Sequence, residues 1–357
     1  MESKNYKIRN ILLSVILAIN IVIIALLLYF LSPVTIKSNS VDFIISEGDS
    51  IDEIAHNLKK EGLIKNENIF KAYLTLKKGR YLYAAKYHLN SNQSLNKIVK
   101  TLKQGGVNPD EITITFEEGL NMKKVAQVIS ENTNNSYEDV LNKANDSTYL
   151  KTVINKYWFV TKDIENKDIY YKLEGYLFPD SYNFSSKDVD VETIFNNMLD
   201  HMNIKISPYK ESIEKNKYST HQLFTMASIV ELEAIDKTSR KDVSGVFYNR
   251  LNSGMTLGSD VTSYYGVGKE MTSDITQSEL DNINPYNTRV ASMAGKLPVS
   301  PICNFSIESL DAALNPNKHD YLYFVADKNG KIYMTKDFAT HEKVIADLKS
   351  KGLWLEW

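Results

Sequence analysis

Residues 221 to 234 read HQLFTMASIVELEA, and this stretch decides the fold of the second half of the chain. Only two carboxylates, Glu231 and Glu233, interrupt an apolar run, which predicts a helix in the middle of its domain. On helical geometry Glu231 shares a stripe with Phe224 and Ala227, so its side chain leaves a face that is otherwise core. Burial disfavours the charged form of a carboxyl, and a carboxylic acid that keeps its proton suits acid catalysis. Glu231 is therefore the candidate catalytic acid and base.

The second carboxylate, Glu233, is interpreted as a surface residue. Lys237 lies four residues further on, where it can form an ion pair with Glu233 on the helix surface. Residues two apart diverge by about 200° around the helix axis, so the two glutamates cannot both face one small cleft. For Glu231 an alternative stays open, in which it is a structural carboxylate held by buried backbone groups or by an arginine.

The sequence around this helix predicts a mixed α+β domain over residues 173–350. Val191, Ile194 and Phe195 begin one helical apolar pattern, and a second one ends before Gly254. Near the C-terminus two strand-like runs flank Asn329-Gly330, the strongest short signal of a β-hairpin.

The first half contains a weak internal repeat, since residues 43–58 align with residues 114–129 without a gap. Each copy has an alternating strand, a Gly turn and an amphipathic helix. This unit resembles the LysM fold, which binds N-acetylglucosamine chains, and we expect a LysM-like module over residues 43–130. A spacer or dimerisation module is the alternative. Residues 131–172 are expected to form a connecting helical segment.

A single transmembrane helix is predicted at the N-terminus. Residues 11–31 carry no charge and suffice to cross about 30 Å of hydrocarbon. Lys4, Lys7 and Arg9 precede this span, so the positive-inside rule places residues 1–10 in the cytoplasm and the bulk outside a cell membrane. Residues 32–42 are interpreted as a linker.

Composition excludes several classes of function. The net charge of −2 and the absence of a basic tail give no support for nucleic-acid binding. Cys303 is the only cysteine, and the six histidines show no ligand spacing, so no metal and no cofactor are expected.

Several motifs in the second half resemble those of one family, the endolytic murein transglycosylases (MltG or YceG-like proteins). They are LEGYLFPD at 173–180, ASIVE at 227–231, VFYNRL at 246–251, PYNT at 285–288 and YLYFVAD at 321–327. The resemblance implies that Glu231 is the catalytic glutamate of this family. Two segments depart from the family pattern, at Gly258 and Val261 and over residues 299–306, and leave loop shape near the cleft open.

The other motif residues are candidate contacts to substrate, although each can equally cap a helix, form a turn or pack in the core. Glu174 is the best candidate for a second polar group. The full set of candidate substrate-binding residues is Glu174, Tyr176, Tyr248, Asn249, Asp260, Tyr286 and Asn287.

The resemblance implies lytic transglycosylation of peptidoglycan glycan strands, in which the 6-hydroxyl of N-acetylmuramic acid attacks its own C1 and leaves a 1,6-anhydro end. One carboxyl can serve both proton transfers in this reaction. A hydrolase that uses Asp260 or Glu174 as a second acid is the first alternative. A non-catalytic peptidoglycan-binding scaffold is the second. The expected partners are glycan strands, the lipid bilayer and enzymes of peptidoglycan synthesis, and internal cuts would limit the length of nascent strands.

Overall fold

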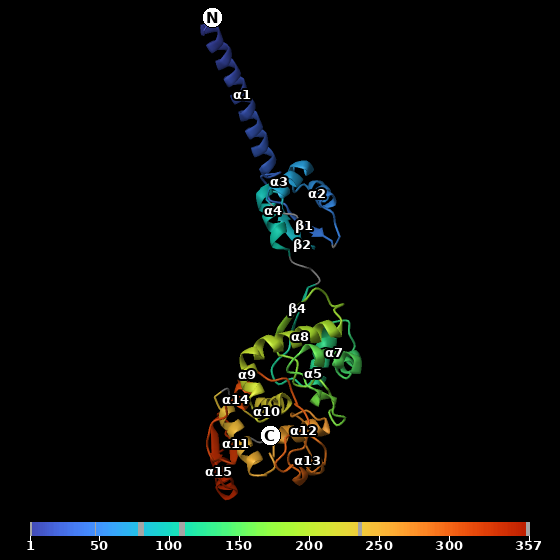
Figure 1. Cartoon of the computed structure of the whole chain (residues 1–357), viewed down its shortest axis with the longest axis vertical. Helices are drawn as coiled ribbons and strands as arrows, with labels where there is room; N and C mark the ends of the chain where they lie inside the picture. Colours follow the sequence, from blue (N-terminus) through green and yellow to red (C-terminus); the bar gives the residue numbers. More distant parts are fainter. Residues whose placement is uncertain (1, 47, 78–81, 107–110, 235–237, 355–357) are drawn as a thin grey trace. The chain divides into compact units, whose positions relative to one another are not determined.

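The computed structural model describes residues 2–46, 48–77, 82–106, 111–234 and 238–354 (Figure 1). The chain divides into two compact units, unit 1 over Met1–Glu111 and unit 2 over Ile112–Trp357. Each unit buries a hydrophobic cluster of its own. The chain is therefore a mixed helix and strand protein with two separate cores.

Unit 1 begins with a long apolar helix, α1 (Glu2–Leu31). Its segment Leu13–Leu31 has 19 residues, a mean hydropathy of 2.8 and no buried residue. Among the described helices it is the one that is long and apolar enough to cross a membrane. The predicted single apolar helix at the N-terminus is present.

The remainder of unit 1 is a small module of two antiparallel strands and three helices. Phe43 on β1 lies opposite Tyr87 on β2, and both side chains are buried against the helices. Ser50 and Glu53 form a capping box that fixes the start of α2. The elements are β1 (Ser40–Ile45), α2 (Ile51–Lys60), α3 (Glu67–Leu76), β2 (Ala85–Asn90) and α4 (Leu95–Gln104).

The internal repeat of the sequence is a structural repeat. Each copy consists of a strand, a glycine with positive φ and a helix. The first copy is β1, Gly48 (φ +95°) and α2. The second copy is β3 (Ile112–Thr115), Gly119 (φ +81°) and α5 (Met122–Asn132). The copies belong to different units, because β3 pairs with β4 (Ser181–Phe184). The predicted module over 43–130 thus extends across the boundary of the two units.

Unit 2 is mostly helical, with two short antiparallel sheets, β3-β4 and β5-β6. The segment 131–172 shares the core of α10, since Val140, Val153 and Phe159 are in the same buried cluster as Phe224. The further helices of unit 2 are α6 (Tyr137–Ala144), α7 (Ser147–Lys156), η1 (Lys162–Glu165), α8 (Val191–Ile206), η2 (Ser207–Tyr209), α9 (Lys210–Glu214), α10 (Thr220–Glu233), α11 (Arg240–Asn252), α12 (Asp260–Val267), α13 (Gln277–Leu280), η3 (Ala291–Met293), α14 (Ile307–Leu314) and α15 (Phe338–Ser350).

The predicted central helix is α10, which packs against α14, α11 and α12 (Figure 1). Ser219 and Gln222 form a capping box at its start, and almost every side chain from His221 to Val230 is buried. The helix ends at Glu233, because Ala234 leaves the helical region with φ −87° and ψ 120°. Both glutamates of interest therefore lie in the last turn of α10.

The predicted hairpin is also present. β5 (Tyr323–Ala326) and β6 (Ile332–Thr335) pair in antiparallel register, and Gly330 in the turn has a φ of +80°. Both side-chain oxygens of Asp327 accept hydrogen bonds within the turn and its flanks, which fixes the connection.

Candidate active site

Glu231 is enclosed at the C-terminal end of α10, with 6% of its side chain exposed. Its Oε1 accepts a hydrogen bond from Nη2 of Arg240 at 2.6 Å. Its Oε2 accepts two more, from the backbone N–H of Ser306 at 2.8 Å and from the Ser306 hydroxyl at 2.5 Å. Charged and backbone donors together stabilise a carboxylate. This site thus combines a buried carboxyl with three hydrogen-bond donors.

The loop that carries Ser306 is anchored to the loop that precedes β4. The side-chain oxygen of Asn304 accepts a hydrogen bond from the backbone N–H of Leu177, and its backbone carbonyl accepts one from the N–H of Gly119. A side chain at Gly175 would collide with Pro301, because a Cβ atom at position 175 would lie 2.3 Å from the Cβ of Pro301. The family-like segment LEGYLFPD and the departing segment 299–306 are therefore packed together beside Glu231.

Arg240, the first residue of α11, is the charged partner of Glu231. Its side chain is 8% exposed, and Nε and Nη1 have no hydrogen-bond acceptor among the described residues. From the sequence, an arginine is an expected partner only in the alternative in which Glu231 is a structural carboxylate, and Arg240 is not singled out. Its position could have identified Arg240, because a side chain at the start of the helix after α10 can contact the C-terminal end of α10.

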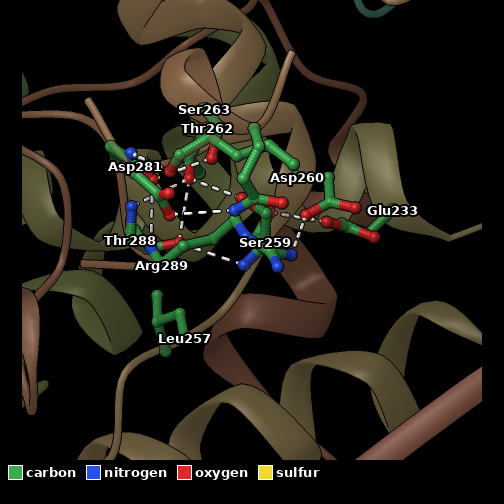
Figure 2. Close-up of polar contacts among 12 residues, drawn as sticks. Glu233, Leu257, Ser259, Asp260, Thr262, Ser263, Asp281, Thr288 and Arg289 are labelled. Atoms are coloured by element: carbon green, nitrogen blue, oxygen red, sulfur yellow. Dashed lines mark hydrogen bonds and ion pairs between the residues drawn. The ribbon is translucent and has the colours of Figure 1, made fainter. Parts of the chain in front are cut away.

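Glu233 is half-buried at the end of α10, and Lys237, its expected ion-pair partner, lies outside the described residues, so that ion pair stays a prediction. The Oε1 of Glu233 accepts a hydrogen bond from the Ser259 hydroxyl at 2.5 Å. Burial raises the pKa of Glu233 to about 7, the Ser259 bond and Arg250 lower it, and Asp260 raises it. Ser259, at the start of α12, thus lies against Glu233, a contact that the sequence did not predict (Figure 2).

Glu174 is fully enclosed, with 1% exposure, between α5 and α12. Its Oε2 accepts the backbone N–H of Met122 at 3.0 Å and the hydroxyl of Tyr265 at 2.9 Å. Its Oε1 has no partner among the described residues. Burial raises the pKa of Glu174 to about 8, against the effect of the two hydrogen bonds. This carboxyl is held largely in its neutral form at neutral pH.

The aromatic candidates lie in the core rather than on an open surface. The Tyr176 hydroxyl lies 2.7 Å from Nδ1 of His221, and the Tyr248 hydroxyl donates to the carbonyl of Ala313. The Tyr286 hydroxyl contacts the Ser300 hydroxyl and accepts the N–H of Tyr170. The hydroxyl groups of all three tyrosines thus have partners within the protein. Stacking of these rings on sugars stays a prediction.

The polar candidates divide into two groups. The Asn249 side chain donates to the carbonyls of His319 and Tyr321, and Asn287 donates to the carbonyls of Leu280 and Asn282. Both therefore hold loops in place. Asp260, in contrast, is exposed at the start of α12 and forms an ion pair with Arg289. Their contact with substrate stays a prediction as well.

A buried glutamate with an arginine and a backbone donor, in a mixed helix and strand unit, is the type of site found in enzymes that use a carboxyl for acid–base chemistry. The YceG-like family model matches residues 43–347. The chain belongs to this family, and the resemblance that the motifs predicted is confirmed.

Relatives with known names support the same assignment. The chain is 38% identical over 315 residues to an endolytic murein transglycosylase of Bacillus subtilis (strain 168), a match that covers 88% of this chain and 86% of that protein. It is 32% identical over 337 residues to an endolytic murein transglycosylase of Streptococcus pneumoniae serotype 2 (strain D39), covering 88% and 60%. A crystal structure of a yceG-like protein from Listeria monocytogenes is similar with a TM-score of 0.61 and 34% identity, covering 86% of this chain and all of that chain.

Proposed function

We propose that this protein is an endolytic lytic transglycosylase, a lyase that cuts peptidoglycan glycan strands and leaves 1,6-anhydro-N-acetylmuramic acid ends. The observation that carries the proposal is the environment of Glu231, a buried carboxyl with three donors at the end of α10. Family membership and the names of the relatives support the substrate and the class of reaction.

Glu231 would serve both proton transfers. As an acid it donates a proton to the oxygen that leaves C1, and Arg240 and Ser306 stabilise the carboxylate that remains. As a base this carboxylate accepts the proton of the 6-hydroxyl, which attacks C1 of the same sugar. The nucleophile is part of the substrate, so the reaction gains from proximity and needs no activated water.

The remainder of the chain would place this site near new cell wall. We propose that α1 crosses the cell membrane once with the first residues in the cytoplasm, because Lys4, Lys7 and Arg9 precede the apolar segment. The module of unit 1 is proposed to be LysM-like and to bind glycan, which its order of strand, helix, helix and strand supports. Internal cuts near synthesis enzymes would then limit the length of nascent strands.

The product decides between the proposed reaction and hydrolysis. Digestion of uncrosslinked glycan strands by the detergent-solubilised protein should release anhydro ends, which are lighter than reducing ends by one water and resist borohydride. Reducible ends as the main product would instead show a muramidase, and binding without cleavage would show a scaffold.

A pair of variants tests the role of Glu231. We expect Glu231→Gln to lose at least about a hundredfold in rate, because an amide cannot exchange the proton. This variant also leaves Arg240 without its counter-charge, which can destabilise the fold. The double variant Glu231→Gln with Arg240→Met removes both charges and should recover stability in thermal unfolding without recovering cleavage. Recovery of cleavage would show that Glu231 is only structural.

A further inference from the structure

Ser259 and Thr262, at the start of α12, form one buried hydrogen-bond network with Thr288 of the PYNT motif (Figure 2). The Ser259 N–H donates to the Thr288 hydroxyl at 3.1 Å, and the hydroxyls of Thr288 and Thr262 lie 2.8 Å apart. The Thr288 carbonyl accepts the N–H of Gly258 at 3.0 Å. The network therefore fixes the backbone of residues 257–260.

This network ends on Glu233. Ser259 is the N-cap residue of α12, a position where a serine hydroxyl usually accepts a hydrogen bond from the first turn of the helix. The structure shows no such cap bond, and the hydroxyl donates to Oε1 of Glu233 instead. The side chain that could stabilise α12 is thus used to join α12 to the end of α10.

We propose that Glu233 is a positioning residue of the reaction, whose hydrogen bond with Ser259 holds the loop 257–260 against the turn of α10 that carries Glu231. The inference rests on the proposed function and deepens it. Glu233 lies two residues after Glu231, so a displacement of this turn moves the acid relative to the scissile bond. A misplacement of about 1 Å at such a group can cost on the order of a hundredfold in rate.

The charged groups around Glu233 explain why its protonation matters. Among the described residues these are Asp260 of α12 and Arg250 of α11, while Arg289 is paired with Asp260. A negative charge on Glu233 would also stand at the C-terminal end of α10, where the helix dipole disfavours anions. Since the pKa of Glu233 is raised to about 7, the neutral form is present below this pH and is lost as the pH rises through it. Ionisation would set Glu233 against Asp260 and loosen the loop.

The test compares cleavage rates of three variants with wild type at about pH 6 and about pH 8. Glu233→Gln stays neutral and can still accept a hydrogen bond from Ser259, so its kcat should fall less between the lower and the higher pH than the kcat of wild type does. Ser259→Ala should lower kcat by about tenfold. Ser263→Ala is the matched control, because it removes another buried hydroxyl of α12 that bonds to Asn287 and not to Glu233.

Three results would overturn the inference. The first is a loss of cleavage rate in Glu233→Gln as large as in Glu231→Gln at both pH values. The second is an equal effect of Ser259→Ala and Ser263→Ala on kcat. The third is an identical pH profile for wild type and Glu233→Gln. Should Ser259→Ala fail to fold, as judged by thermal unfolding, the pH profile of Glu233→Gln still decides. A wild-type protein that cleaves no glycan would refute the proposed function together with this inference, whereas the three results above refute this inference alone.

Discussion

The substitution Glu174→Gln separates the cost of a buried ionisable group from its packing. The glutamine keeps the shape of the side chain, and its carbonyl can accept the bonds from the Met122 N–H and the Tyr265 hydroxyl. The substitution removes only the group that can ionise. Burial raises the pKa of Glu174 from an ordinary 4.5 to about 8 in the folded protein. Between these values the folded state holds a proton that the unfolded chain has lost.

The sign and size of the effect follow from this difference. Because the native state binds the additional proton, the free energy of unfolding of the wild type decreases as the pH rises through this window. Each pH unit contributes roughly 1.4 kcal/mol, which gives about 5 kcal/mol over the whole window. Glu174→Gln lacks this decrease but places an amide at the unpartnered Oε1 position, a constant cost of about 1–3 kcal/mol. The variant should be less stable than wild type in acid and more stable at about pH 8.

Urea unfolding of the detergent-solubilised chain, followed by tryptophan fluorescence over a series of pH values, measures both curves. The three tryptophans, Trp158, Trp354 and Trp357, all belong to unit 2, so the signal reports the unit that contains Glu174. Glu138→Gln, an exposed carboxyl on α6, is the control and should leave the pH dependence unchanged. Parallel curves for wild type and Glu174→Gln would refute the argument, since they would mean that Glu174 ionises equally in both states.

Three further predictions concern other parts of the chain. Asn249→Ala should lower the free energy of unfolding by about 1–3 kcal/mol, because it leaves the carbonyls of His319 and Tyr321 without their donor, and urea unfolding measures this. Ser306→Gly should change the cleavage rate by less than about tenfold, since the backbone N–H to Glu231 remains, and a hundredfold loss would show that the hydroxyl is the essential donor. Protease added to intact spheroplasts should digest the bulk of the protein; digestion only after lysis would reverse the proposed orientation.

The parts of the fold that were predictable from the sequence depend on local pattern. The apolar stretch from His221 is helical as far as Glu233 because apolar side chains recur on all its faces, and the hairpin at Asn329-Gly330 forms because Gly330 accepts a positive φ. The repeat was visible because the same alternation of buried positions, such as Phe43 and Ile114, fills two cores. Its division between two units was not visible, since the pairing of β3 with β4 joins residues about 70 positions apart, as Thr113 with Asn183 shows.

The contacts of the site could not be predicted for the same reason. Glu231 meets Ser306 across 75 positions in the chain, and Glu233 meets Ser259 across 26. Spacing along α10 correctly indicated that the two carboxylates point in different directions. It could not show that the second direction is also covered by protein, because helical geometry contains no information on the loop that lies over it.

Glu231, Glu233 and Glu174 have different hydrogen-bond partners, and these partners suit different roles. Glu231 has an arginine and a backbone N–H, which suit a group that must become a carboxylate during the reaction. Glu233 and Glu174 accept hydrogen bonds from hydroxyl or backbone donors, and burial raises the pKa values of both carboxyls. A carboxyl that changes its charge during the reaction needs donors that stabilise the charged form. The hydrogen bonds from Arg240 and Ser306 therefore support the proposal that Glu231 performs the proton transfer.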